Sequence, residues 1–175
     1  MILLRRLTEY VNLKKLLSPN QIGFKKGHST SDHIFLLTTV LDKVVKKDKE
    51  KLYTAFIDFK KAYDTVDREL LFEHLNDLGI NGPFLQNLKS MYENTKYFIK
   101  LTGGYTDALE SNLGLKQGCP LSPLLFNLYI DNMNKIFSTE CDPIKLQGFA
   151  LNHFLYADDL LLLSKTPQGL QKVFR

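Results

Sequence analysis

Cysteine and long apolar runs are both scarce in this 175-residue sequence. Its two cysteines, Cys119 and Cys141, lie far apart, and neither belongs to a CxxC motif or has a histidine-rich neighbourhood. This pattern argues against a disulfide framework and against a zinc site. It is typical of a reducing, intracellular compartment, although nothing in the sequence distinguishes nucleus from cytoplasm.

A membrane partner is also not expected. The leucine run at 160–163 has only four residues, whereas a membrane helix needs about 20 apolar residues. At the N-terminus, arginines follow the apolar residues and no small-residue cleavage site is present, so residues 1–10 do not resemble a signal peptide.

Positive charge is only slightly in excess over negative charge, and the formal net charge is +4. This bias permits a nucleic-acid partner, but many ordinary soluble proteins share it. The composition, 44% hydrophobic and 24% charged, indicates one globular domain that can bury its own core.

Helices and strands are interspersed in the predicted order. Residues 1–17 form an amphipathic helix, and Ser29 or Thr30 caps a second helix. Its expected apolar face comprises Ile34, Leu37, Leu41, Val44 and Val45. Residues 52–59, rich in β-branched and aromatic side chains, predict a buried strand.

The second half continues this mixture. Asp67 caps a helix through Leu78, and Pro83 opens another through about residue 93. A hairpin is expected on either side of residues 102–104, and Ser122 is expected to cap a helix reaching about residue 137. A second hairpin flanks residues 157–159. This irregular alternation favours an α+β fold over a doubly wound sheet.

The acidic pair Asp158-Asp159 lies within a strongly apolar hairpin. Carboxylates are costly to remove from water, so this placement needs a reason. One explanation is that the two residues simply form a polar turn. The other is a cation site, because hard oxygen ligands suit Mg²⁺.

A third carboxylate, Asp58, lies near the end of the 52–59 strand. If that strand runs beside the 153–164 hairpin, Asp58 and Asp158 can hold two metals between them, as in phosphoryl displacement. The alternative is a strand-end charge in solvent. Asp64 and Asp67 are weaker candidates because they fall in the following turn and helix cap.

Four ordered segments resemble the motifs of reverse transcriptases. Residues 55–67, 114–131 and 154–159 are similar to the three central palm motifs, and residues 20–34 are similar to the preceding finger motif. The details are most similar to non-LTR (LINE-type) retrotransposons. Group II intron enzymes are the nearest alternative.

The resemblance implies an α+β polymerase palm, an antiparallel sheet backed by helices, with part of the fingers and without the thumb. Residues 1–50 would be partial fingers and residues 51–175 the palm core, all within one reverse transcriptase domain. The remainder of a larger element-encoded polyprotein is then expected as a partner.

The resemblance also implies residue roles at the metal site. Asp58 and Asp158 would be the principal ligands of two Mg²⁺ ions, for which Mn²⁺ could substitute. Asp159 would be a supporting acidic partner, and the main-chain carbonyl of Phe59 would also face a metal.

Substrate-binding roles follow in the same way. Tyr63 matches the aromatic gate beneath the incoming sugar, which leaves no room for a 2′-hydroxyl. Gln117 and Gly118 match the loop beside the incoming nucleotide, where glycine lets the backbone approach closely. Lys25 and Lys26 would contact template phosphates, or they simply form a solvated surface.

The function implied is RNA-directed DNA polymerisation, with an RNA template, a DNA primer and dNTPs as partners. The alternative is a catalytically inactive, truncated remnant that at most binds nucleic acid.

Overall fold

The computed structural model describes residues 2–134, 136–137, 143–146 and 148–173, so Cys141 lies outside the described residues. The chain forms two compact units: Met1–Lys60 together with Ile130–Arg175, and Lys61–Tyr129. The expected division into fingers and palm near residue 50 stays a prediction.

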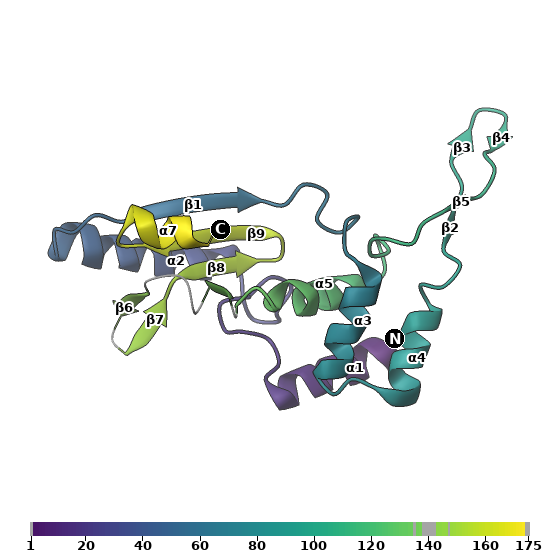
Figure 1. The fold of residues 1–175 in the computed structure, drawn as a ribbon, viewed down its shortest axis with the longest axis horizontal. Helices are drawn as coiled ribbons and strands as arrows, with labels where there is room; N and C mark the ends of the chain where they lie inside the picture. The colour runs from purple at the N-terminus through teal and green to yellow at the C-terminus, as the bar shows by residue number, and fades with distance from the viewer. Residues whose placement is uncertain (1, 135, 138–142, 147, 174–175) are drawn as a thin grey trace. The chain divides into compact units, whose positions relative to one another are not determined.

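A three-stranded antiparallel sheet forms the centre of the first unit (Figure 1). Its strands, in spatial order, are β1 (Tyr53–Asp58), β9 (Asp159–Ser164) and β8 (His153–Tyr156). The strand predicted at residues 52–59 therefore does lie beside the hairpin predicted around residues 157–159.

The expectation that β1 is buried was wrong: it alternates between half-buried and exposed residues, and Phe56 is 79% exposed. The reason is that β1 is an edge strand of this sheet.

Two helical segments, α2 (Thr30–Leu41) and the π-helical η1 (Asp42–Lys47), pack on this sheet. Ser29 and Asp32 form a capping box at the start of α2, as predicted for Ser29. The shared core comprises Val40, Val44, Ile144, Leu151, Phe154 and Leu163. Part of the predicted apolar face was wrong, because the side chains that pack toward the sheet are those of residues 37, 40 and 44. Three side chains beside them are exposed instead: Ile34, Leu41 and Val45.

The described residues of this unit form four further elements. They are α1 (Ile2–Lys14), the β6 (Ile144–Leu146) and β7 (Phe149–Leu151) hairpin, and α7 (Pro167–Lys172). The sequence predicted α1 but neither the β6–β7 hairpin nor α7.

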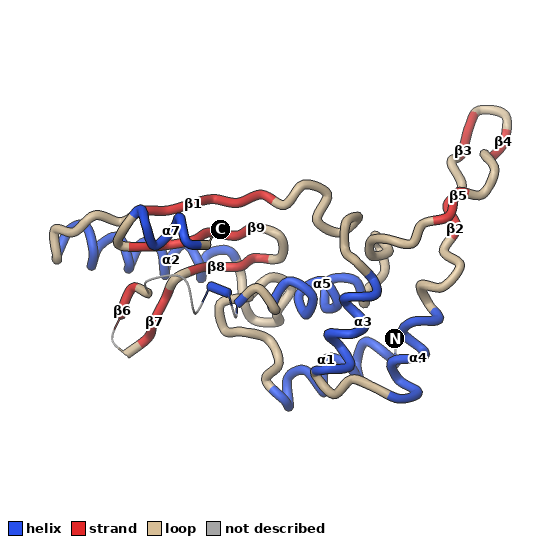
Figure 2. Tube along the Cα trace, in the orientation of Figure 1, coloured by secondary structure: helices blue, strands red, loops and turns tan. Residues whose placement is uncertain are grey.

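Before the start of α5, the second unit contains two helices and a long hairpin (Figure 2). The helices are α3 (Arg68–Asp77) and α4 (Gly82–Ser90). The hairpin is interrupted: β2 (Lys96–Tyr97) pairs with β5 (Leu109–Glu110), and β3 (Lys100–Leu101) pairs with β4 (Gly104–Tyr105). These elements match the predicted ones, although α4 ends before the expected residue 93.

Helix α5 (Ser122–Asp131) starts in the second unit, and it ends before the predicted residue 137. The prediction that Ser122 caps this helix was also wrong. Ser122 is the first helical residue, and its hydroxyl donates to the carbonyl of Lys116 at 2.7 Å.

Candidate active site

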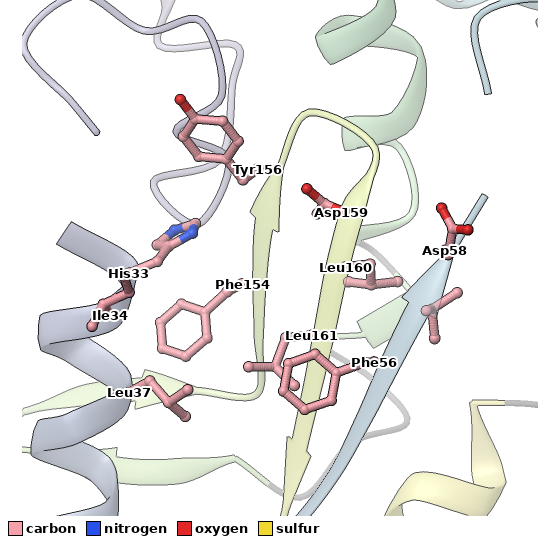
Figure 3. Close-up of a pocket in the computed structure, with 11 residues that line it drawn as sticks. His33, Ile34, Leu37, Phe56, Asp58, Phe154, Tyr156, Asp159, Leu160 and Leu161 are labelled. Atoms are coloured by element: carbon pink, nitrogen blue, oxygen red, sulfur yellow. The ribbon is translucent and has the colours of Figure 1, made fainter. Parts of the chain in front are cut away.

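Two aspartates lie opposite one another at one end of the central sheet. Asp58, the last residue of β1, lies opposite Asp159, the first residue of β9. Directly opposed residues of an antiparallel pair place their side chains on the same face. Figure 3 shows both residues at this end of the sheet, on neighbouring strands, and both are exposed. The ladder thus concentrates negative charge at one water-accessible point.

The next rung on the same face is apolar. Leu161 lies between Phe56 on β1 and Phe154 on β8. Side chains from α2 approach this rung and leave a cavity of about 350 Å³ (Figure 3). Its lining includes His33, Ile34, Leu37, Phe154, Tyr156 and both carboxylates. The carboxylates therefore border an apolar hollow on one side.

Asp158 occupies the turn between β8 and β9. The two-residue tip is Ala157-Asp158, so Asp159 belongs to the strand rather than to the turn. Ala157 has a φ of 55°, an uncommon value for a residue with a Cβ. Asp158 is half-buried, as is Phe59, which follows Asp58 at the end of β1.

The donor set fits a hard divalent cation. Within the described residues, no group of three or more His, Cys, Asp or Glu side chains is arranged to hold a metal. Mg²⁺ does not require such a cage, because it usually takes one or two carboxylates and completes its shell with water and phosphate. Asp58 and Asp159 across the ladder, with Asp158 next in the chain, supply carboxylates of this kind.

A buried histidine lies in the strand that leads to the turn. Burial, with a smaller contribution from His33, lowers the pKa of His153 to about 4. Its Nδ1 lies 2.7 Å from Asn152 Oδ1, and its Nε2 lies 3.5 Å from Asn20 Nδ2. Because Asn152 Nδ2 donates to the carbonyl of Phe137, its Oδ1 is the acceptor, and the His153 ring is neutral with Nδ1 protonated.

In the second unit, Tyr63 stacks on Phe126. The ring centroids are 4.4 Å apart with an interplanar angle of 14°. This contact fixes the plane of the half-buried Tyr63 ring, as a side chain that limits the space for a sugar would require.

The loop before α5 contains the other two predicted nucleotide-binding residues. Gln117 is exposed, and its Nε2 donates to Asp64 Oδ1 at 2.9 Å. Gly118 has a φ of +80°, and a Cβ added there would meet no atom within 4 Å. Its glycine is required by the backbone conformation rather than by crowding.

Arg68 fixes the segment that precedes this loop, and sequence reasoning did not single it out. Arg68 is 6% exposed, and among the described residues its side chain donates to main-chain carbonyls. Nε donates to the carbonyl of Gly114 at 2.7 Å, Nη1 to those of Ser111 at 2.7 Å and Tyr92 at 3.3 Å, and Nη2 to that of Leu113 at 2.8 Å.

Asp67, the residue before Arg68, accepts hydrogen bonds from two main-chain amides as the cap of α3, which is the structural role predicted for it.

The two candidate phosphate-binding lysines differ in their surroundings. Lys25 is half-buried, and its Nζ donates to the carbonyl of Ser18 at 3.2 Å. Burial lowers the pKa of Lys25, partly offset by Asp131. Lys26 is exposed and is the more accessible of the two.

The model of the family "Reverse transcriptase (RNA-dependent DNA polymerase)" matches residues 1–175. The chain belongs to this family. The family resemblance and the fold class predicted from the sequence are confirmed. Reverse transcriptases generally use divalent metal ions, in keeping with the donor set at the sheet edge.

Curated relatives support the predicted non-LTR origin. The chain is 30% identical over 173 residues to the "Retrovirus-related Pol polyprotein from type-2 retrotransposable element R2DM" of Drosophila melanogaster. It is 28% identical over 178 residues to the "Probable RNA-directed DNA polymerase from transposon BS" of the same organism. These alignments cover 97% and 98% of the chain, but only 16% and 19% of the relatives.

Solved structures share the fold. Apo telomerase from Candida tropicalis superposes with a TM-score of 0.73 at 17% identity, covering 98% of this chain and 32% of that one. Telomerase from the same organism with a fragment of telomeric RNA gives a TM-score of 0.69 at 18% identity, covering 98% and 29%. In the part of the chain that the structure describes, no helix is long and apolar enough to cross a membrane.

Proposed function

We propose that this chain is the catalytic core of an RNA-directed DNA polymerase from a non-LTR retrotransposon. The reaction would be attack of a primer 3′-hydroxyl on the α-phosphate of a dNTP, with pyrophosphate as the leaving group. The observation that carries the proposal is the rung formed by Asp58 and Asp159, with Asp158 in the adjoining turn.

Asp58, Asp158 and Asp159 would hold two Mg²⁺ ions, with the main-chain carbonyl of Phe59 as a further oxygen donor. When bound, such ions stabilise the attacking and the leaving oxygens of an in-line displacement. The pairing of Asp58 with Asp159 supports a role for Asp159 beside the principal ligands Asp58 and Asp158. Because β1 and β9 are joined by a ladder, the two carboxylates are positioned before substrate binds.

Substrate selection would depend on the second unit. Tyr63 would lie beneath the sugar and exclude ribonucleotides, with its ring held by Phe126. Gln117 and Gly118 would lie against the nucleotide and template, and Lys26 and Lys25 against template phosphates. RNA template and DNA primer are the partners this reaction requires.

Primer extension tests the proposal. The 175-residue chain, an RNA template with a DNA primer, dNTPs and Mg²⁺ should give extension products. Asp158→Asn should abolish extension, because it removes a ligand charge while keeping the side-chain volume. The matched control is Asp48→Asn, which makes the same change at an exposed residue after η1. This control should extend as the wild type does.

Template binding separates the two functional classes. A chain that binds the primer–template duplex but never extends it, under Mg²⁺ or Mn²⁺, would be a nucleic-acid-binding remnant. Extension that survives in Asp158→Asn would refute the assignment of the metal site.

A further inference from the structure

A short segment of the chain, residues 20–23, docks along β8 next to the turn that carries Asp158. Gln21 forms a parallel bridge with Leu155. The amide of Ile22 donates to the carbonyl of Leu155 at 3.1 Å, and the amide of Leu155 donates to the carbonyl of Asn20 at 3.0 Å. The segment thus adds one strand-like contact beside the catalytic hairpin, on the edge that β9 does not cover.

The Gln21 side chain reaches the turn itself. Its Nε2 donates to the carbonyl of Ala157 at 3.2 Å, and its Oε1 accepts from the amide of Ala157 at 3.1 Å. Oε1 also accepts from the amide of Gly23 at 3.0 Å. Gln21 is 0% exposed, so these bonds form out of contact with water. One carboxamide therefore satisfies both main-chain groups of the first turn residue.

This contact coincides with the strained point of the turn. Ala157 has a φ of 55°, which for a residue with a Cβ costs on the order of 1–2 kcal/mol. Such a conformation persists only where its surroundings hold it. Gly23 lies against the same residue: a Cβ added to Gly23 would lie 2.2 Å from the Ala157 nitrogen. Segment 20–23 therefore packs closely against the turn at Ala157.

We infer that Gln21 is a positioning residue of the active site: its carboxamide fixes Ala157, and through it the directions of Asp158 and Asp159. The inference rests on the proposed function, because it concerns the same carboxylates. Gln21 touches no reacting group. Its effect passes through two hydrogen bonds to one main-chain unit, from which the aspartates follow directly in the chain.

The variant Gln21→Met removes both hydrogen bonds to Ala157 and the one from the Gly23 amide, and it keeps the side-chain length. Gln171→Met, at an exposed residue of α7 in the same unit, is the matched control. Electron paramagnetic resonance measures Mn²⁺ binding to the full chain, and this measurement tests the metal site without requiring turnover. Gln21→Met should weaken Mn²⁺ binding by about 10-fold or more, as changes to residues that orient metal ligands do. The control should bind as the wild type does.

Extension kinetics give the second readout. Gln21→Met should lower kcat by about 10-fold or more and leave the KM for dNTP nearly unchanged, because the variant alters the metal ligands and not the nucleotide contacts. Unchanged Mn²⁺ affinity and unchanged kcat in a folded Gln21→Met chain would overturn the inference.

A measurement on the wild type keeps the inference testable if Gln21→Met does not fold. The amide of Ala157 and the side-chain amide of Gln21 should exchange hydrogen slowly, at rates close to those of the β8–β9 ladder. Exchange of the Ala157 amide at the rate of an open turn would overturn the inference. If Asp158→Asn leaves Mn²⁺ binding unchanged, the proposed function fails instead, and slow exchange at Ala157 would still support the fixing of Ala157 by the Gln21 carboxamide.

Discussion

Asp58 and Asp159 lie directly opposite one another at the end of the β1–β9 ladder, 101 positions apart in the numbering (159 minus 58). Antiparallel pairing with like charges on one rung is destabilising. A cation bound between the carboxylates would relieve that repulsion, which is what the proposed metal site requires. The prediction from the acidic pair alone, a polar turn, accounts for Asp158 but not for Asp159.

Replacement of Tyr63 should relax the choice of sugar. Tyr63→Val removes the ring held by Phe126, so a 2′-hydroxyl would meet less obstruction. We expect the ratio of ribonucleotide to deoxyribonucleotide incorporation to rise by about 10- to 100-fold, as for other steric discriminations. Single-nucleotide extension measures this ratio. Tyr63→Phe keeps the ring and should behave as the wild type; equal ratios in the valine and phenylalanine variants would exclude a gate.

Gly118→Ala should show separately how Gly118 affects folding stability and how it affects the KM for dNTP. The added methyl meets no atom within 4 Å, so the cost to folding comes from the positive φ alone, about 1–2 kcal/mol. If the nucleotide approaches this loop closely, the methyl should also raise the KM for dNTP several-fold. Thermal unfolding and steady-state extension measure the two effects. A KM equal to that of the wild type would argue against nucleotide contact at Gly118.

Arg68→Met should destabilise the second unit strongly. The variant leaves carbonyls of the loop before Gln117 without their charged donor, and such hydrogen bonds contribute about 1.5–3 kcal/mol each. We expect a loss of about 3 kcal/mol or more in the free energy of unfolding, measured with urea. Lysine should not rescue the loss, because its single ammonium cannot reach the carbonyls as the planar guanidinium does.

Arg5→Met is the control for Arg68. Arg5 forms an exposed ion pair with Glu9, and such pairs contribute about 0–1 kcal/mol. A similar small loss in Arg68→Met would mean that the buried guanidinium does not hold the loop.

Acid should weaken the first unit through His153. Its pKa is about 4 in the folded chain, below the ordinary value of 6.5, so the unfolded chain binds the proton more readily. The stability that comes from burying the neutral ring is complete above pH 6.5. It falls as the pH drops from 6.5 to about 4, by about 3 kcal/mol in total.

Urea unfolding between pH 4 and pH 7.5 measures this dependence. His153→Gln cannot be protonated in this range and should show a shallower slope. Identical slopes for the variant and the wild type would show that His153 does not become protonated on unfolding.

Local patterns predicted most of the elements, but not the contacts that join distant segments. The β8–β9 hairpin and the Asp67 cap could be predicted because their causes lie within a few residues. The exposure of Phe56 could not, since it depends on which strands neighbour β1. Gln21 and Arg68 were missed for the same reason: Gln21 bonds to a residue 136 positions away, and Arg68 to one 46 positions away.

The central claim is that Asp58, Asp158 and Asp159 hold the catalytic metals of a DNA polymerase. Its most direct test is single-turnover primer extension on an RNA template by Asp58→Asn, with Asp48→Asn as the charge-matched control. We predict that Asp58→Asn binds the primer–template duplex as the wild type does and extends it about 100- to 1,000-fold more slowly, the scale of loss when a key electrostatic group is removed. Extension by Asp58→Asn at the wild-type rate would contradict the account.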